Sequence, residues 1–231
     1  MTPALDGGPI LKTASTEIGV LETAAELEAR LSQMGVQSIL ESVALLETKQ
    51  SLADCGDLGQ HQDKSLATKA PRLAKQDGEL NMHYPVRCLD RLIRGLQPWP
   101  GCFAHLQFPD GKMLRVIFSK ATPIEFDVAS LHTVPLHTVP LHTVPGDLLY
   151  GDTLRSLLET NVNLNACVER HASSSLYAVA TDGLLAIPSV QPAGKRLMSS
   201  EEFLRGYSRY SSMKIASVPG SHPLLNKMSC S

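Results

Sequence analysis

The chain has 231 residues, of which 43% are hydrophobic and 19% charged, a composition that supports one large or two small globular domains. No apolar run approaches the roughly 20 residues that a membrane helix needs, which argues against a membrane partner. Residues 1–65 carry 4 basic and 10 acidic side chains, a net charge of −6, whereas residues 66–231 carry 17 and 13, a net charge of +4. Only the second part could therefore face a polyanion such as a nucleic acid.

The five cysteines are widely spaced and contain no Cys-x-x-Cys pair. This pattern argues against a disulfide scaffold or a zinc ribbon and favours a reducing compartment.

The first segment, residues 1–48, has the pattern of the end of an α/β unit. Leu5–Leu11 is a Gly-rich turn that runs into a strand, and Thr23 and Glu26 have the spacing of a capping box. Apolar residues at three- and four-residue spacing then predict one or two helices over residues 23–48. Such a piece without neighbouring strands exposes apolar surface and unpaired backbone, so we expect residues 1–48 to be poorly ordered or sticky.

Residues 49–80 are poor in apolar side chains and predict a linker on the surface. A short helix follows over residues 86–96, with its leucines and Ile93 on one side and three arginines on other faces. Trp99, flanked by prolines, is expected to plug the core of the next domain rather than to stack on bases.

Short β-prone runs separated by turn residues come next, which predicts a small antiparallel barrel or sandwich. The runs are Cys102–Phe108, Met113–Phe118, Leu148–Tyr150, Leu176–Ala180 and Leu184–Ile187. Overall the pattern predicts the α+β class.

Residues 131–145 are three copies of Leu-His-Thr-Val-Pro. A proline at every fifth position prevents a helix and removes donors from a strand, and the five-residue step places successive histidines on opposite faces of an extended chain. We therefore interpret the repeat as a duplication inside an exposed loop and expect no metal site.

A basic corner ends the patterned part of the chain. Pro192 and Gly194 predict a turn that carries Lys195 and Arg196, and Ser199 with Glu202 has the spacing of a second capping box, which predicts a short helix.

Four blocks of this sequence resemble, in order, the folate-dependent formyltransferases, and the methionyl-tRNA formyltransferases in particular. Leu5–Leu11 is similar to their Leu-Asp-x-Gly-Pro segment, and Thr68–Leu73 to Thr-Tyr-Ala-Pro-Lys-Ile, with Lys69 where an aromatic residue is usual. Arg91–Gly101 is similar to Arg-x-Ile-Arg-Ala-x-Asn-Pro-Trp-Pro, and Gln191–Ser199 to Gln-Pro-Ala-Gly-Lys-Lys/Arg-x-Met-Ser. The likeness weakens over residues 121–175 and after about residue 210.

The resemblance implies a domain plan. Residues 1–48 would be the end of a Rossmann-like catalytic domain, 49–80 a linker, 81–215 an OB-like antiparallel barrel that faces tRNA, and 216–231 a tail. The implied reaction transfers a formyl group from 10-formyltetrahydrofolate to the methionine α-amine of initiator methionyl-tRNA, without a metal. The implied setting is the mitochondrial matrix, and we expect a monomer.

The resemblance also implies the site residues. Asp6 matches the family's catalytic aspartate, a carboxylate that could take the proton lost by the attacking amine. The family's Asn-x-His-x-Ser-Leu-Leu-Pro motif does not occur in this sequence, so we expect Asp6 to be idle in this chain. Phosphate contacts to tRNA are expected from six cations: Lys69, Arg72, Arg91, Arg94, Lys195 and Arg196. Lys195 and Arg196 could equally be a solvated turn, and at least one of Arg87, Arg91 and Arg94 is expected to be structural.

Two other hypotheses stay open. The chain could be a non-catalytic tRNA- or RNA-binding module derived from the enzyme. It could instead belong to a folate-dependent enzyme acting on a sugar nucleotide or a purine precursor, against which the Pro-Trp-Pro and Gln-Pro-Ala-Gly-Lys blocks count.

Overall fold

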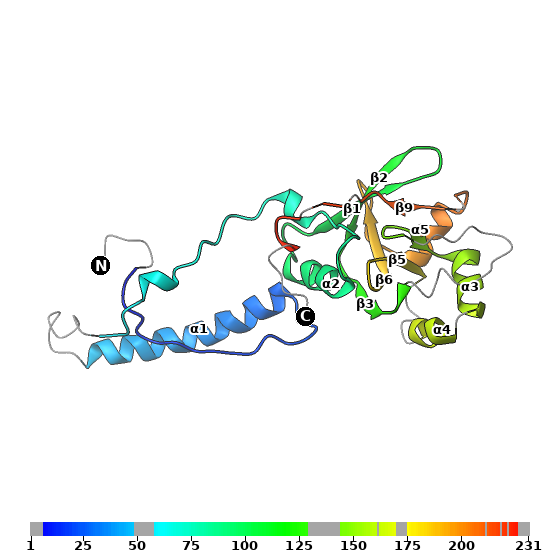
Figure 1. Cartoon of the computed structure of the whole chain (residues 1–231). Coiled ribbons are helices and arrows are strands. Elements are labelled where there is room, and N and C mark those ends of the chain that lie inside the picture. The colour runs from blue at the N-terminus through cyan, green and yellow to red at the C-terminus, as the bar shows by residue number, and fades with distance from the viewer. Residues whose placement is uncertain are drawn as a thin grey trace. The chain divides into compact units, whose positions relative to one another are not determined.

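The structure is a computed structural model that describes residues 7–48, 58–128, 144–160, 162–169, 175–210, 212–217, 219–220 and 222–225. The chain divides into two compact units, which we call the amino-terminal unit (residues 1–72) and the carboxy-terminal unit (residues 73–231). Helices and antiparallel strands occur together, as the predicted α+β class requires (Figure 1).

One long helix, α1 (Ala24–Glu47), dominates the amino-terminal unit. Its predicted capping box is present, because the Glu26 amide donates to Thr23 Oγ1 at 3.4 Å and the Thr23 amide donates to Glu26 Oε2 at 2.8 Å. Gly35 does not break the helix, so the predicted helical region is a single element.

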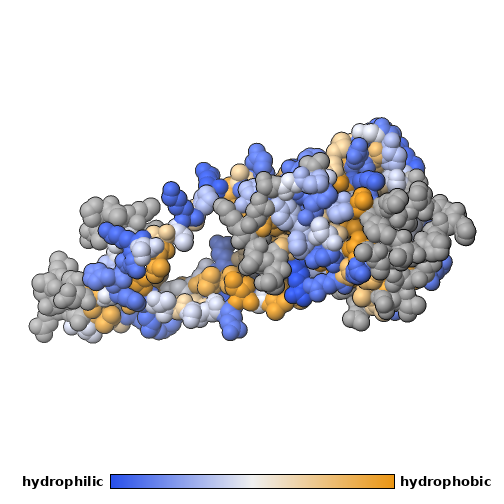
Figure 2. All heavy atoms as spheres, in the orientation of Figure 1, coloured by the Kyte–Doolittle hydropathy of each residue, from blue (hydrophilic) through white to orange (hydrophobic). Residues whose placement is uncertain are grey.

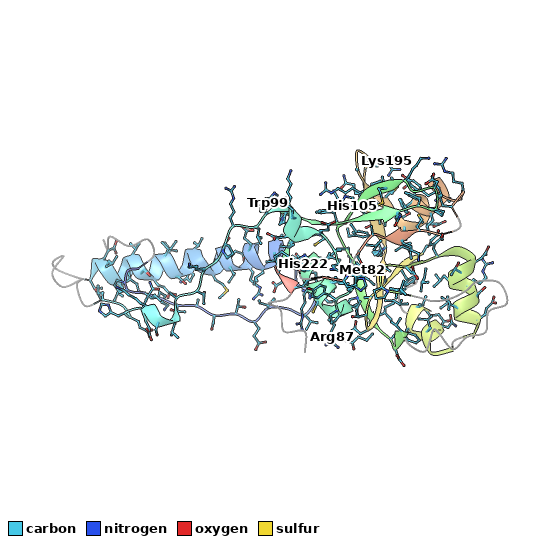
Figure 3. The ribbon with its side chains drawn as sticks, turned by 45° about the horizontal axis from the view of Figure 1, so that its top comes forward. Met82, Arg87, Trp99, His105, Lys195 and His222 are labelled. Carbon is cyan, nitrogen blue, oxygen red and sulfur yellow. The ribbon has the colours of Figure 1, made fainter. Side chains whose placement is uncertain are left out.

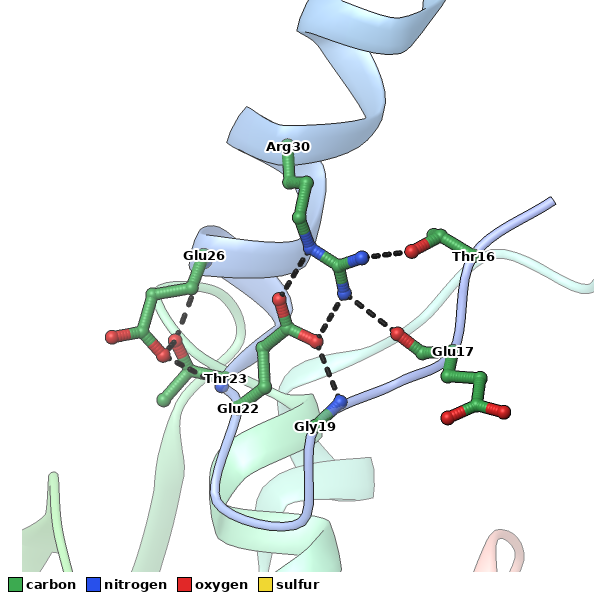
Figure 4. Close-up of polar contacts among 7 residues, drawn as sticks. All are labelled: Thr16, Glu17, Gly19, Glu22, Thr23, Glu26 and Arg30. Carbon is green, nitrogen blue, oxygen red and sulfur yellow. Dashed lines mark hydrogen bonds and ion pairs between the residues drawn. The ribbon is translucent and has the colours of Figure 1, made fainter. Parts of the chain in front are cut away.

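Arg30 fastens the preceding chain segment to the start of α1 (Figure 4). Its Nη2 lies 2.6 Å from Glu22 Oε2 and donates to the Glu17 carbonyl oxygen at 2.8 Å, and its Nη1 donates to the Thr16 hydroxyl. Glu22 Oε2 also accepts from the Gly19 amide at 2.9 Å. The guanidinium and backbone donors lower the pKa of Glu22, which stays ionised.

None of the described residues of the amino-terminal unit is buried. The strand expected within Leu5–Leu11 is represented by one antiparallel bridge between Ile10 and Gln60, and residues 1–6 lie outside the described residues. A short 3₁₀ turn, η2 (Lys64–Leu66), completes the unit. Large apolar side chains therefore remain on its surface, where Figure 2 shows them as orange atoms: Ile18, Val20, Leu21, Leu31, Val36, Ile39, Leu40 and Val43 among others.

The carboxy-terminal unit contains two antiparallel sheets. One has the strand order β8 (Met198–Ser199), β7 (Ser189–Pro192), β2 (Met113–Phe118), β1 (Cys102–Gln107) and β9 (Lys214–Ile215). The other has the order β3 (Thr122–Glu125), β6 (Gly183–Ile187), β5 (Leu176–Val179) and β4 (Leu148–Leu149). The five predicted runs are confirmed as β1, β2, β4, β5 and β6.

The two sheets are joined directly, because β6 continues into β7 after Pro188. At the other side, one isolated antiparallel bridge between Asp147 and Lys214 links the start of β4 to β9, but the strands form two separate sheets, so the expected OB-like barrel is not confirmed.

Helices surround these sheets: η3 (Lys75–Gly78), α2 (Val86–Gly95), α3 (Gly151–Thr160), α4 (Val162–Glu169) and α5 (Ser200–Gly206). The helix predicted over residues 86–96 is confirmed as α2, and Ser199 caps α5 as predicted, accepting from the Glu202 amide at 3.1 Å. Helices α3 and α4, which lie side by side in Figure 1, were not predicted.

The sheet β3–β6–β5–β4 separates two hydrophobic cores. On β6, Leu185 and Ile187 belong to the first core, whereas Leu184 and Ala186 belong to the second, with Leu157 of α3 and Leu164 of α4. The first core also contains Leu89 and Ile93 of α2 and Phe203 of α5. Because both faces of this sheet are covered, β6 is apolar along its whole length rather than at alternate positions.

The C-terminal segment returns to the first core. Leu225 is buried there, and its amide donates to His222 Nδ1 at 3.1 Å. The His222 amide in turn donates to the Tyr84 hydroxyl at 2.8 Å, next to α2.

Two expectations need correction. Trp99 does not plug the core, because its side chain is 53% exposed. The close packing at that turn is made instead by the backbone, since a Cβ on Gly78 would lie only 1.9 Å from the Gly101 carbonyl oxygen.

The cysteines supply the second correction. Cys88 is disulfide-bonded, while Cys102 and Cys167 are free, so disulfide bonding is not absent from the chain as the cysteine spacing indicated. The part of the chain that the structure describes contains no helix long and apolar enough to cross a membrane.

Candidate nucleic-acid interface

The basic turn predicted after Pro192 is present and is attached to the β1–β2 sheet. The Lys195 amide donates to the Pro192 carbonyl oxygen at 3.0 Å, and Gly194 between them has a φ of +73°, which favours glycine. The Ala193 amide donates to the Arg115 carbonyl oxygen at 2.9 Å, so the turn is fastened to β2. The turn therefore has a defined position at this edge of the sheet.

Lys195 and Arg196 have different surroundings within this turn. The Arg196 guanidinium pairs with the Glu202 carboxylate, which neutralises its charge locally. Lys195 Nζ lies 5.6 Å from the centroid of the Tyr207 ring, and no carboxylate among the described residues pairs with it. The positive charge of Lys195 is therefore not neutralised by a carboxylate of the described residues.

A second cation lies on β2 beside this turn. The Arg115 guanidinium carbon is 4.0 Å from the centroid of the Phe103 ring on the neighbouring strand β1. His105, which is opposite Arg115 in the strand register, has its Nδ1 at 3.2 Å from Glu79 Oε1. Arg115 has no carboxylate partner in the described ranges, so its charge also remains available.

A third cation of the same kind is Arg209, which follows α5. Its guanidinium carbon lies 4.8 Å from the centroid of the Tyr210 ring, and the Tyr210 hydroxyl donates to Asp110 Oδ2 at 2.9 Å. The Tyr210 and Phe108 rings have centroids 4.5 Å apart, which anchors the site to the first core.

Two groups of cations can be distinguished in the described part of the carboxy-terminal unit, and Lys75, Lys120 and Arg205 belong to neither. Arg115, Lys195 and Arg209 lie over aromatic rings, and we call them the ring-supported cations. Carboxylate partners hold the other group: Arg87, Arg94, Lys112, Arg155, Arg196 and Lys214. An aromatic ring orients a cation without cancelling its charge, so the ring-supported cations are the better prepared to bind phosphate.

The arginines of α2 are not among the ring-supported cations. Arg94 Nε lies 3.0 Å from Asp90 Oδ2, and the two side chains are 19% and 8% exposed. Burial raises the pKa of Asp90, and the bond to Arg94 opposes that rise, so Arg94 stabilises a buried carboxyl group. The pair with Asp90 supports the expectation that at least one of the α2 arginines is structural. Arg91 is half-buried on the same helix and attracts the Asp90 carboxylate electrostatically.

The remaining predicted site residues lie elsewhere. Lys69 and Arg72 are exposed in the amino-terminal unit, on a segment without helix or strand. Asp6 lies outside the described residues, as do residues 131–143 of the repeat. The role of all six predicted cations and of Asp6 stays a prediction.

Two of the three ring-supported cations, Arg115 and Arg209, were missed by the sequence reasoning. The signal for Arg115 was available in principle, because a strand with Arg between apolar residues follows a hairpin turn that places it opposite the aromatic-rich β1. Arg209 could not be found in this way, since Tyr210 reaches Phe108 only through the tertiary fold.

A shallow, open surface depression of about 650 Å³ lies in the amino-terminal unit, lined by Glu17, Gly19, Leu21, Glu22, Glu26 and Arg30. Its three carboxylates and its one, already paired, guanidinium do not suit an anionic co-substrate. Across the described ranges no three His, Cys, Asp or Glu side chains gather where they could hold a metal ion.

Comparison with known proteins identifies the class of protein to which this sheet and its basic edge belong. Residues 72–208, more than half of the chain, match the formyl transferase C-terminal domain, and the chain belongs to that family. Its helices and antiparallel sheets are consistent with that domain.

The similar curated proteins are methionyl-tRNA formyltransferases. That of Rhodopirellula baltica is 34% identical over 207 residues, which cover 90% of this chain and 52% of the relative. That of Pseudomonas putida strain KT2440 is 35% identical over 117 residues, covering 51% of this chain and 35% of the relative. That of Solibacter usitatus is 40% identical over 97 residues, covering 42% and 29% respectively. The chain spans about half the length of the first of these relatives, and less of the others.

Proposed function

We propose that this chain is the tRNA-binding part of a methionyl-tRNA formyltransferase, together with the end of a Rossmann-like catalytic domain. The reaction would move a formyl group from 10-formyltetrahydrofolate to the methionine α-amine of initiator tRNA, for translation initiation in an organelle. The names of the relatives and the match over residues 72–208 support this proposal.

The observation that carries the tRNA part is the set of ring-supported cations. Arg115, Lys195 and Arg209 lie over aromatic rings, whereas six other described cations of the unit have carboxylate partners. Phosphate contacts of this kind position a nucleic acid without reading its bases. Lys69 and Arg72, exposed ahead of the carboxy-terminal unit, would add further phosphate contacts.

In an enzyme with a complete catalytic domain, Asp6 would accept the proton that the attacking amine loses, whereas we propose that this chain alone is inactive. The acidic depression beside Arg30 does not suit formyltetrahydrofolate, and we propose that this co-substrate binds elsewhere. We further propose that the protein works as a monomer in the mitochondrial matrix.

The tRNA interaction is tested by salt-dependent binding of an initiator tRNA transcript. Arg115→Ala and Lys195→Ala should each weaken binding by about 1 kcal/mol, roughly fivefold, and lower the slope of log K against log salt by about 1. Arg155→Ala is the matched control, because that exposed arginine is paired with Asp152 on α3 and should leave binding unchanged. If all three variants bound the transcript as tightly as the wild type does, the proposed surface would be contradicted.

A non-catalytic tRNA-binding module is the second candidate. It is favoured by the family match, which lies over residues 72–208 and includes Arg115 and Lys195. A formyl-transfer assay separates the two, because Asp6→Asn should abolish turnover in an enzyme and change nothing in a binding module.

The cellular setting is tested by immunoblotting a mitochondrial extract with an antibody against the carboxy-terminal unit. A single species well above 25.0 kDa would indicate a product that includes a complete catalytic domain. A species at 25.0 kDa would favour the binding module, and absence from mitochondria would contradict the proposed localisation.

A further inference from the structure

Trp99 is a large aromatic side chain left on the surface of the carboxy-terminal unit. It is 53% exposed and is the single tryptophan of the chain. None of the aromatic or cation contacts of the ring-supported cations involves it. About half of the Trp99 side chain is therefore exposed to solvent and is not used by the aromatic and cation contacts described above.

The loop that carries Trp99 is held at both ends. Before it, the Gln97 side chain donates to the Ser119 carbonyl oxygen, and Leu96 is buried in the first core. After it, the Gly101 amide donates to the Leu96 carbonyl oxygen at 2.9 Å, and the Gly101 carbonyl packs against Gly78. The exposed indole is thus presented by an anchored loop, so little conformational entropy is lost when a ligand covers it.

The same loop leads directly into the strand that bears the candidate interface. Trp99 is four residues before Phe103, the ring beneath Arg115, a span of at most roughly 14 Å. Figure 3 shows Trp99, His105 and Lys195 toward the same side of the view, whereas Arg87 and His222 lie away from it. Since nucleotides of one strand follow each other about every 3.4 Å along a helix, a strand whose phosphates contact Arg115 would reach Trp99 within a few nucleotides.

An exposed indole beside unpaired cations has the chemistry of a base-stacking platform. Every base offers an aromatic face, and stacking on a protein ring combines with phosphate contacts along a basic groove. A protein partner is less well matched, because the other exposed large apolar residues of this unit's described part, Met113, Val144 and Leu197, belong to three different segments.

We propose that Trp99 stacks on an unpaired base of tRNA held at the edge that carries Arg115 and Lys195. This inference rests on the proposed function, since it requires that the carboxy-terminal unit binds tRNA. It adds a stacking contact to the phosphate contacts and gives the interface a preference for tRNA features with an accessible base.

The single tryptophan makes the test direct. Full-length chain is titrated with an initiator tRNA transcript while tryptophan emission is recorded, and binding is measured independently by anisotropy of labelled tRNA. Stacking should quench the emission with the same midpoint as the anisotropy change. Trp99→Ala should weaken binding by about 5- to 150-fold, whereas Trp99→Phe should keep part of the affinity.

Val144→Ala is the matched control, because Val144 is 45% exposed and lies outside the candidate interface. Its binding should equal that of the wild type. The wild-type quenching measurement needs no substitution and stands even if Trp99→Ala fails to fold.

Two results would overturn the inference. They differ in whether the proposed function also fails. If labelled tRNA binds while the emission of Trp99 is unchanged and Trp99→Phe binds like the wild type, the stacking role is wrong and the proposed function survives. If the wild type shows no salt-dependent tRNA binding, the proposed function and the stacking role both fail.

Discussion

Helices α1 and α2 both form as predicted, but α2 is much the more strongly amphipathic of the two and they differ in burial. α2 buries six of its ten residues, including Leu89 and Ile93, against strands β3 and β6. α1 is 24 residues long and buries none, although it carries a capping box and the Arg30 clamp. Local signals are therefore sufficient to define where a helix begins and ends, but a core forms only where other elements cover the apolar face.

This comparison extends from the two helices to the two units. The carboxy-terminal unit contains two cores on either side of a sheet, whereas the described residues of the amino-terminal unit expose their large apolar side chains. Helix α1 depends on exposed contacts such as the Lys12–Glu41 pair, at 2.6 Å between Nζ and Oε2. Pairs of this kind contribute little in water.

The largest expected difference is in backbone hydrogen exchange. Amides of β5 and β6, which are buried on both faces, should exchange only on global unfolding, whereas those of α1 should exchange through local fraying. We expect protection factors to differ by about 10³-fold or more, measured by hydrogen–deuterium exchange with mass spectrometry. Similar protection over α1 and β5–β6 would show that the exposed face of α1 is covered in solution.

A matched pair of leucine substitutions should give the next largest difference. Leu89→Ala on α2 removes a side chain with 0% exposure and should cost about 2–5 kcal/mol in the free energy of unfolding. Leu40→Ala on α1 removes a leucine side chain that is 61% exposed. It should change the free energy of unfolding by no more than about 0.5 kcal/mol. Urea unfolding followed by Trp99 fluorescence and circular dichroism measures both. A comparable cost for the two variants would contradict the difference between the helices.

The smallest effect concerns pH and the C-terminal segment. His222 Nδ1 accepts the Leu224 and Leu225 amides at 3.2 and 3.1 Å, and its Nε2 donates to the Glu79 carbonyl oxygen at 3.1 Å. Burial lowers the pKa of His222, although the Glu79 carbonyl and the Asp77 and Glu79 carboxylates oppose this. A protonated ring would lose both accepted bonds, because its Nδ1 would then carry a proton.

Because the folded pKa lies below the unfolded value of 6.5, His222 stabilises the fold above that pH and loses its contribution as the pH falls toward the folded pKa. We expect a decline of about 1–2 kcal/mol, measured by urea unfolding from pH 8 to pH 5. His222→Asn should unfold with a shallower dependence on pH while other histidines titrate as before. An unchanged dependence would show that the segment does not rely on neutral His222.

The local elements were largely predictable from particular residues. Thr23 and Ser199 marked the starts of α1 and α5, because a capping signal depends only on residues three apart. Of the two, the full capping box forms only at Thr23 and Glu26, since the Glu202 carboxylate pairs with Arg196. The run Met113–Phe118 and its turn at Asp110–Gly111 marked the β1–β2 hairpin for the same reason. Strands β3, β7, β8 and β9 were missed. Three of them pair with strands far away in the sequence, β3 with β6, β7 with β2 and β9 with β1, and β8 has only two residues.

The candidate site was predictable only in part. The turn with Lys195 follows from Pro192 and Gly194, and its presence was confirmed. That Arg196 is paired and Lys195 is not depends on Glu202 and Tyr207, whose positions the packing of α5 determines. Trp99 was expected in the core on its apolar character alone, but the backbone contact between Gly78 and Gly101 occupies that turn.

By itself, the sequence determined the helix starts, the main strands, the basic turn and the family resemblance, because each depends on short-range pattern or on motif identity. Only the tertiary structure decided which apolar faces are buried, which cations keep their charge and which aromatic side chain remains in water. Those outcomes depend on contacts between distant segments, whose free energies no local pattern contains.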